Sequence, residues 1–308
     1  MKSVVLSVAL ALGMAATTAV AEEASCKKVR FADVGWTDIQ VTTGTAQVIL
    51  EALGYEPEVK TLSVPVTYAS LKNKDLDVFL GNWMPSMTAD IKAYLEDKSV
   101  ETIGVNLENA GYGLVVPQYV ADAGVKSLAD LAANKDKFKG KIYGIEAGND
   151  GNRIISEMIA KKENKLDGFE LVESSEAGML TEAEKAMKNK EWIIFLGWTP
   201  HPIMGAMKIH YLDGMGDSGF GAATVATNVR AGYTKECPNV GKLLSNLKFN
   251  LEMEGAMMEP VLKSQADPKA TAAAWLKANK DAVKPWLAGV TTFDGKEGLA
   301  AVTAALSK

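Results

Sequence analysis

Short apolar runs alternate with helix-patterned segments along this chain. Residues 28–34 form the first strand-like run, and Ile39, Ile49 and Leu53 then recur at helical spacing until Gly54. Three further segments follow, a strand at 58–64, a helix at 65–73 and a short buried strand at 77–80. This order predicts an α/β protein in which helices pack on largely parallel strands.

A second alternating series begins after the strand-like run at 112–117. Its predicted helices and strands cover 127–133, 141–145, 152–162, 168–172, 181–188 and 192–196. A glycine-rich stretch at 213–219 then precedes an apolar run at 222–229, and the pattern from residue 233 onward is helical. We interpret 112–117 and 222–229 as two crossings between separate parts of the fold.

The length of the chain supports two lobes. The roughly 287 residues after position 21 exceed the usual size of one domain, which is about 100–150 residues. We predict one lobe built from 22–111 and 213–308, and a second lobe built from 112–212. The first lobe would therefore contain both ends of the exported chain.

The first 21 residues have the pattern of a secretion signal. Lys2 precedes an apolar run that ends in small residues and the triplet Ala19-Val20-Ala21, while the acidic Glu22 follows. The run is short for a membrane span, which needs about 20 residues. We predict that 1–21 is a cleaved signal peptide and that the protein is exported to the periplasm.

Two cysteines, Cys26 and Cys237, are present. In an oxidising compartment an even pair usually forms a disulfide, which would tie the start of the exported chain to a segment more than 200 residues away. Two buried free thiols are the alternative. The cysteines and the two histidines, His201 and His210, lack zinc-ligand spacing, so we expect no metal and no cofactor.

The charge and the motifs disfavour several functions. The net charge of −5 is spread along a chain with only three arginines, so we expect no nucleic acid partner. Neither histidine lies in a nucleophile motif, and the glycines of 148–151 lack both the P-loop Lys-Ser/Thr and a dinucleotide fingerprint. We therefore expect no enzymatic activity, and a monomer.

Four aromatic residues recur just after glycines. Gly35-Trp36, Gly81-Asn82-Trp83 and Gly197-Trp198 follow apolar strands, and Gly111-Tyr112 repeats the step at the first crossing. Loops beyond the carboxyl ends of strands are where ligands bind in α/β sheets. Each ring taken alone could simply pack in the core. Their recurrence instead predicts that the four rings converge on one cleft.

An aromatic cleft suits a quaternary ammonium ion. Such a cation has no N–H to donate, but its charge and its methyl groups are both stabilised by aromatic faces, at about 2 kcal/mol for each desolvated contact. Asp38 could add negative charge or accept a hydrogen bond from a ligand hydroxyl, or it could cap the helix that follows. Asn149 could bind the same hydroxyl, or only form a turn.

These motifs resemble those of the periplasmic substrate-binding proteins of ABC importers for quaternary amines, over nearly the whole exported chain. The resemblance rests on four segments, Gly35-Trp36-Thr37-Asp38, Leu80-Gly81-Asn82-Trp83-Met84-Pro85, Gly111-Tyr112-Gly113-Leu114-Val115-Val116-Pro117 and Gly197-Trp198-Thr199-Pro200-His201-Pro202. It implies a hinged, two-lobed type II periplasmic-binding-protein fold. It also implies that an ABC permease is the membrane partner.

The resemblance further implies that Trp36, Trp83, Tyr112 and Trp198 box a trimethylammonium group, with Asp38 and Asn149 at the hydroxyl end. We therefore expect choline as the ligand, with acetylcholine or a betaine as other candidates. Glycine betaine or proline betaine is the main alternative, but its carboxylate would be repelled by Asp38. A choline-ester hydrolase would need a nucleophile motif that is missing, whereas a sensor that signals to a receptor would use the same cleft.

Overall fold

The computed structural model describes residues 21–308, so the predicted signal peptide lies almost wholly outside the described residues. The strands are β1 (Lys28–Asp33), β2 (Glu56–Thr61), β3 (Val78–Met84), β4 (Val100–Pro117), β5 (Lys141–Tyr143), β6 (Glu170–Val172), β7 (Phe195–Thr199), β8 (Ile209–Tyr211) and β9 (Gly221–Arg230). The helices are α1 (Thr37–Ala52), α2 (Val64–Lys72), α3 (Thr88–Glu96), α4 (Gln118–Asp122), α5 (Asp150–Ala160), α6 (Glu176–Lys188), α7 (Pro202–Ala206), α8 (Tyr233–Glu236), α9 (Pro238–Asn246), α10 (Leu251–Ser264), α11 (Pro268–Ala278), α12 (Val283–Trp286) and α13 (Gly298–Ala305).

The strands form one mixed sheet in the order β2-β1-β3-β9-β4-β7-β5-β6, and β8 pairs with β4. As predicted, β1 runs parallel to its neighbours β2 and β3, and β5 runs parallel to its neighbours β6 and β7. The centre differs, because β9 runs antiparallel to both β3 and β4, and β4 runs antiparallel to β7. The prediction of largely parallel strands is therefore correct only at the two ends of the sheet.

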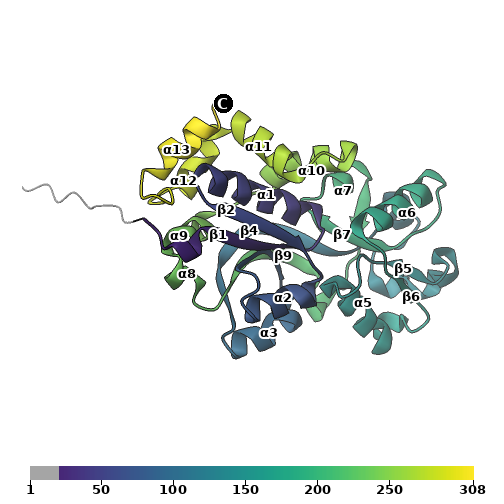
Figure 1. The fold of residues 1–308 in the computed structure, drawn as a ribbon. Helices are drawn as coiled ribbons and strands as arrows, with labels where there is room; N and C mark the ends of the chain where they lie inside the picture. The colour runs from purple at the N-terminus through teal and green to yellow at the C-terminus, as the bar shows by residue number, and fades with distance from the viewer. Residues whose placement is uncertain (1–20) are drawn as a thin grey trace, which may run out of the picture.

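Helices gather around both ends of the sheet (Figure 1). At one end α1, α10 and α11 pack together above β1–β3, with α2 and α3 below. At the other end α5 and α6 flank the short strands β5 and β6. The long strands β4 and β9 connect the two ends, as expected for the two crossings. The residue boundaries of the two lobes stay a prediction.

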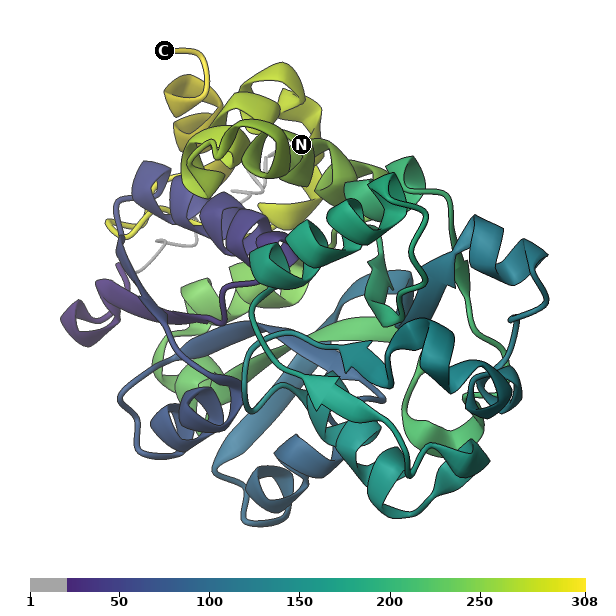
Figure 2. The ribbon, with the colours of Figure 1, turned by 90° about the vertical axis from the view of Figure 1, so that its right-hand side faces the viewer.

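Both ends of the described chain belong to the same part of the fold. Figure 2 shows the purple N-terminal elements beside the yellow C-terminal helices. The predicted disulfide is present, since Cys26 and Cys237 are bonded across a sequence separation of 211. Glu22 strengthens this junction, because its carboxylate accepts hydrogen bonds from the Tyr55 hydroxyl and the Asn239 backbone N–H.

Removing the disulfide should lower stability strongly. A crosslink that closes a loop of this length stabilises the folded state by about 5 kcal/mol, because it restricts the unfolded chain. Replacing both Cys26 and Cys237 by alanine should therefore lower the free energy of unfolding by about that amount. Chemical denaturation of both proteins measures the difference. A variant as stable as the parent protein would show that the crosslink contributes nothing.

Two elements differ most from the sequence pattern. The first crossing was expected at 112–117, but β4 begins twelve residues earlier at Val100. Exposed polar residues interrupt the apolar pattern in this first part of the strand, so the pattern did not predict it. The helix expected at 127–133 consists of two 3-10 segments, Leu128–Asp130 and Ala132–Phe138, and Ser127 and Asp130 form a capping box at its start. No helix among residues 21–308 is both long enough and apolar enough to span a membrane.

Candidate ligand-binding site

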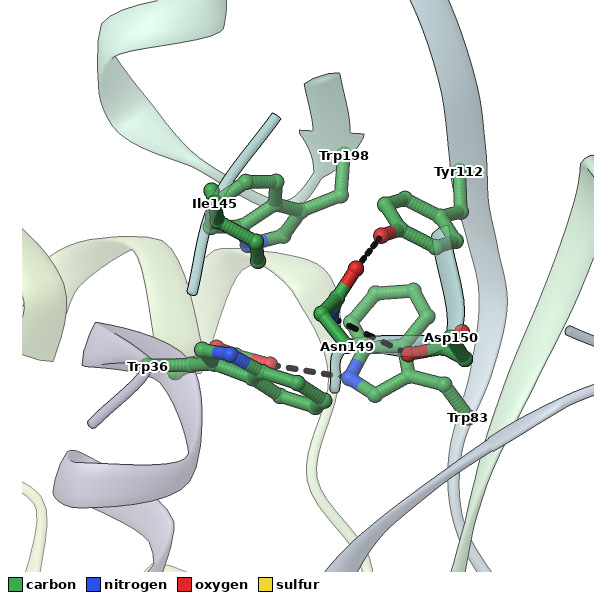
Figure 3. Close-up of a pocket in the computed structure, with 8 residues that line it drawn as sticks. Trp36, Trp83, Tyr112, Ile145, Asn149, Asp150 and Trp198 are labelled. Atoms are coloured by element: carbon green, nitrogen blue, oxygen red, sulfur yellow. Dashed lines mark hydrogen bonds between the residues drawn. The ribbon is translucent and has the colours of Figure 1, made fainter. Parts of the chain in front are cut away.

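A pocket lies where the starts of α1 and α5 meet strands β3, β4 and β7, and Figure 3 shows its wall. Its lining contains all six residues singled out from the sequence and two more. The lining residues are Trp36, Asp38, Trp83, Tyr112, Ile145, Asn149, Asp150 and Trp198. Residues from 36 to 198 in the sequence therefore meet at one place.

The four rings come from four different elements. Trp36 is the N-cap of α1, and Gly35 before it has φ +85°, a conformation that lets the chain turn sharply into the helix. Trp83, Tyr112 and Trp198 lie within β3, β4 and β7. The expectation that Trp83 and Trp198 lie in loops was therefore wrong, because each strand continues past its glycine to include the tryptophan.

The rings are buried and approach each other at steep angles. Tyr112 lies 5.8 Å from Trp83 and 6.5 Å from Trp198, measured between ring centroids, with interplanar angles of 51° and 79°. Phe220 backs Tyr112 edge-on at 5.3 Å. Tilted and edge-to-face arrangements are those that aromatic pairs prefer, and Trp83, Tyr112 and Trp198 all line the same pocket.

Asp38 lies in the first turn of α1, and its carboxylate faces the pocket. Trp36 holds the N-cap position, so the alternative role of Asp38 as the cap is wrong. One oxygen, Oδ2, accepts a hydrogen bond of 3.1 Å from Nε1 of Trp83, while Oδ1 has no partner. Burial and the nearby Glu176 charge together raise the pKa of Asp38 to about 7, although the hydrogen bond from Trp83 lowers it in part.

Asn149 caps a helix and also contacts a ring of the pocket. Its Oδ1 caps α5 by accepting from the Asn152 backbone N–H, and it also accepts from the Tyr112 hydroxyl at 3.2 Å. Its Nδ2 donates to Oδ1 of Asp150 at 3.1 Å, which leaves one amide N–H. The pKa of Tyr112 is raised well above its usual value by burial, so its hydroxyl remains a donor.

Asp150 and Ile145 line the pocket but were not predicted. Asp150 is the first residue of α5, its Oδ2 has no partner, and burial raises its pKa to about 7. The residue follows Asn149 in the glycine-flanked loop already identified, and that adjacency was the available signal. Ile145 follows β5, and an apolar residue after a strand carries no sign of a binding role.

Polar contacts on two sides close the pocket. Trp36 Nε1 donates to Glu146 Oε1 at 2.8 Å, and Arg153 Nη2 reaches the Ser86 carbonyl at 2.7 Å and Asp90 at 2.9 Å. Burial raises the pKa of Glu146, and the hydrogen bond from Trp36 lowers it in part. These contacts join elements that are far apart in sequence, so the pocket wall depends on both ends of the sheet.

The polar atoms left free in the pocket define what it can hold. They are Oδ1 of Asp38, Oδ2 of Asp150 and Nε1 of Trp198, and the lining includes no arginine, lysine or histidine. Two carboxyls and four aromatic faces suit a cation that carries apolar surface. Within residues 21–308, no three His, Cys, Asp or Glu side chains are grouped so as to hold a metal ion.

The other tryptophans pack away from the pocket. Trp286 is buried and donates to the Lys248 carbonyl at 3.0 Å, and Trp192 packs against Phe138 at 5.2 Å. Trp275 is half-buried on α11. None of these three rings lines the pocket.

Comparison with known proteins shows which family the chain resembles. Residues 27–278 match the model of the OpuAC family, the substrate-binding domain of ABC-type glycine betaine transport systems. The glycine betaine/carnitine transport binding protein GbuC of Listeria monocytogenes is 33% identical over 177 residues, which are 56% of this chain and 58% of that protein. An uncharacterized protein of Chromohalobacter salexigens is 60% identical over 137 residues, 44% of this chain and 87% of that protein.

Two solved structures resemble nearly the whole chain. An ABC-transporter choline binding protein in complex with choline is 58% identical, with a TM-score of 0.90, and the match covers 92% of this chain and 100% of the other. An ABC-transporter choline binding protein in an unliganded semi-closed conformation is 59% identical with the same coverage, and its TM-score is 0.84. The fold is thus the two-lobed type II periplasmic-binding-protein fold.

The structure of lactococcal OpuAC complexed with glycine betaine is 26% identical with a TM-score of 0.76, and the match covers 84% of this chain and 98% of that one. These proteins are transport substrate-binding proteins. The chain therefore belongs to the family of substrate-binding domains of ABC-type glycine betaine transport systems.

Proposed function

We propose that this protein captures choline between its two lobes and delivers it to the permease of an ABC importer. Trp36, Trp83, Tyr112 and Trp198 surround the trimethylammonium group, and each desolvated cation–π contact contributes about 2 kcal/mol. The observation that carries the proposal is the convergence of these four buried rings with two partly unpaired carboxyls on one pocket. Two solved choline binding proteins, each close to 60% identical, support it.

The hydroxyl of choline binds at the polar side of the pocket. The free oxygens of Asp38 and Asp150 and the remaining N–H of Asn149 offer it both acceptors and a donor. The oxygen of Asn149 already accepts two hydrogen bonds, from Tyr112 and from the Asn152 backbone, so this residue acts through its nitrogen. Asp150 thus joins Asp38 and Asn149, the residues first assigned to the hydroxyl end.

The same carboxyls disfavour glycine betaine, the alternative ligand. Helix N-termini attract anions, and α1 and α5 both begin at this pocket. Here Asp38 and Asp150 occupy those first turns themselves, so a ligand carboxylate would meet negative charge without a basic side chain from the lining. The family includes glycine betaine binders, but the charges of this pocket favour a ligand with a hydroxyl.

Binding closes the two lobes, and the closed form is what the permease receives. A ligand that contacts both ends of the sheet shifts the population toward the closed form. The contacts of Glu146 with Trp36 and of Arg153 with Asp90 support this step, because they join the two predicted lobes around the pocket. The protein acts in the periplasm as a monomer after removal of residues 1–21. A sensor role would use the same closed form.

A series of ammonium ions tests the proposed cage. The intrinsic tryptophan fluorescence of the purified protein would be titrated with choline, tetramethylammonium and ethanolamine. Tetramethylammonium should still bind, because it keeps the methylated cation, and ethanolamine should bind weakly, because its N–H groups would lose hydrogen bonds to water. Ethanolamine binding as tightly as choline would contradict the cage.

Choline affinity should rise with pH. Asp38 and Asp150 have pKa values of about 7 in the empty pocket, and a bound cation stabilises their ionised forms. Binding below pH 7 must first remove protons, so affinity should fall by up to about tenfold per pH unit for each carboxyl that ionises. Titrations at pH 5.5, 7 and 8.5 measure this slope, which Asp38→Asn should reduce. Equal affinity at pH 5.5 and 8.5 would contradict the prediction.

A further inference from the structure

The carboxylate of Glu176 is buried behind the pocket wall and joins two separate parts of the chain. It lies in the first turn of α6 and is 6% exposed. Its Oε2 accepts from the Thr37 backbone N–H at 2.9 Å, and its Oε1 accepts from the Thr37 hydroxyl. The same Oε1 lies 3.2 Å from Nε2 of His201. One side chain thus connects the start of α1 with the segment that follows β7.

Each partner of Glu176 adjoins residues of the pocket, although neither lines it. Thr37 stands between Trp36 and Asp38 in the sequence. His201 packs edge-on against the Trp198 ring, with centroids 4.7 Å apart and an interplanar angle of 81°. The position of Trp198 relative to Trp36 and Asp38 is therefore connected through Glu176.

The chemistry of the cluster makes this connection strong. An ionised carboxylate only accepts hydrogen bonds, so Nε2 of His201 carries the proton in this contact. Nδ1 of His201 has no partner among the described residues, so Glu176 supplies the one polar contact that orients the ring. If Thr37 moved away, the buried carboxylate would lose two of its three donors, which is costly.

We propose that Glu176 and His201 are positioning residues: Glu176 orients the His201 ring, which in turn supports the Trp198 ring. When the two predicted lobes close, the contact of Glu176 with Thr37 fixes Trp198 relative to Trp36 and Asp38 and completes the cage. The proposal rests on the proposed function for its ligand but not for its geometry. Its consequence is that Glu176 slows ligand release, while the encounter with the open form does not depend on it.

The first test observes Trp198 directly, in the protein without ligand. Indole N–H resonances from ¹⁵N-labelled protein would be assigned with Trp198→Phe and compared for Glu176→Ala, Glu176→Gln and Glu182→Ala. Glu182 is an exposed carboxylate on the same helix and serves as the control. The Trp198 resonance should shift or broaden in Glu176→Ala, shift less in Glu176→Gln, which keeps an acceptor oxygen, and stay unchanged in Glu182→Ala.

His201 gives an independent variant. His201→Phe keeps a ring edge against Trp198 but cannot hydrogen bond to Glu176. It should move the Trp198 resonance as Glu176→Ala does, and the double variant should add little, because the two residues act through one contact. Additive shifts would overturn the proposal, as would a Trp198 resonance that Glu176→Ala leaves at its parent position. This variant also serves if Glu176→Ala does not fold.

Stopped-flow fluorescence with choline measures the consequence for binding. Loss of hydrogen bonds to a charged group changes an equilibrium constant by about tenfold or more. Glu176→Ala should therefore raise the dissociation rate of choline by at least that factor. The association rate should stay within about threefold of the parent value. An unchanged dissociation rate would overturn the proposal. If the parent protein bound no choline, the proposed function would fail, and the indole resonances would still decide the positioning role.

Discussion

Replacing Trp198 by alanine should lower the choline affinity by about 30-fold or more. The ring is 3% exposed and lines the pocket, so the variant loses one desolvated cation–π contact of about 2 kcal/mol together with the apolar surface that shields the cation from water. Isothermal titration calorimetry at fixed pH measures the change. Trp198→Phe should bind with intermediate affinity, because it keeps a smaller aromatic face.

Trp275→Ala is the matched control for this loss. Trp275 is half-buried on α11 and does not line the pocket, so its removal should leave the choline affinity within about twofold. Circular dichroism of each variant would verify that the fold is retained. If Trp198→Ala and the parent protein bound choline with equal affinity, Trp198 would not contribute to choline binding.

The second large effect concerns the choice of ligand. Asp38→Asn and Asp150→Asn remove the two carboxyls of the pocket with little change in shape, so each should weaken choline binding about tenfold or more through the loss of attraction in a buried site. The same changes should strengthen glycine betaine binding, because the repulsion of its carboxylate disappears. The double variant should prefer glycine betaine to choline.

Competition calorimetry with both ligands measures this reversal, and Asp75→Asn is the control. Asp75 is exposed in the turn before β3, and neither affinity should change when it is replaced. If the double variant kept the parent's preference for choline, the carboxyls would not determine specificity. The rings would then have to account for it.

The residues of the site could be predicted because their local patterns are strong. Trp36, Trp83, Tyr112 and Trp198 each follow a glycine at the end of an apolar run, and the structure brings all four to one pocket. The pattern could not predict that β3 and β7 continue through Trp83 and Trp198, because pairing of β3 with β9 and of β7 with β4 extends both strands. Such pairing depends on segments far away in the sequence.

The support behind the site was harder to predict for the same reason. Glu176 lies near the start of a helix and has no unusual neighbours, yet it contacts Thr37, which is 139 positions earlier. His201 lies between two prolines, and nothing in that pattern indicates that its ring is buried against Trp198. Periodicity reveals which residues share a face of one element, not which elements meet. The fold class followed from the alternation of elements, and these contacts required the packed structure.

The central claim is that the pocket selects a methylated cation with a hydroxyl. Calorimetry of the purified protein with choline and with glycine betaine, at pH 8 and equal ionic strength, tests it most directly. We predict a one-to-one complex with choline and weaker binding of glycine betaine, by about tenfold or more, because a carboxylate would face Asp38 and Asp150. Tighter binding of glycine betaine than of choline would contradict the account.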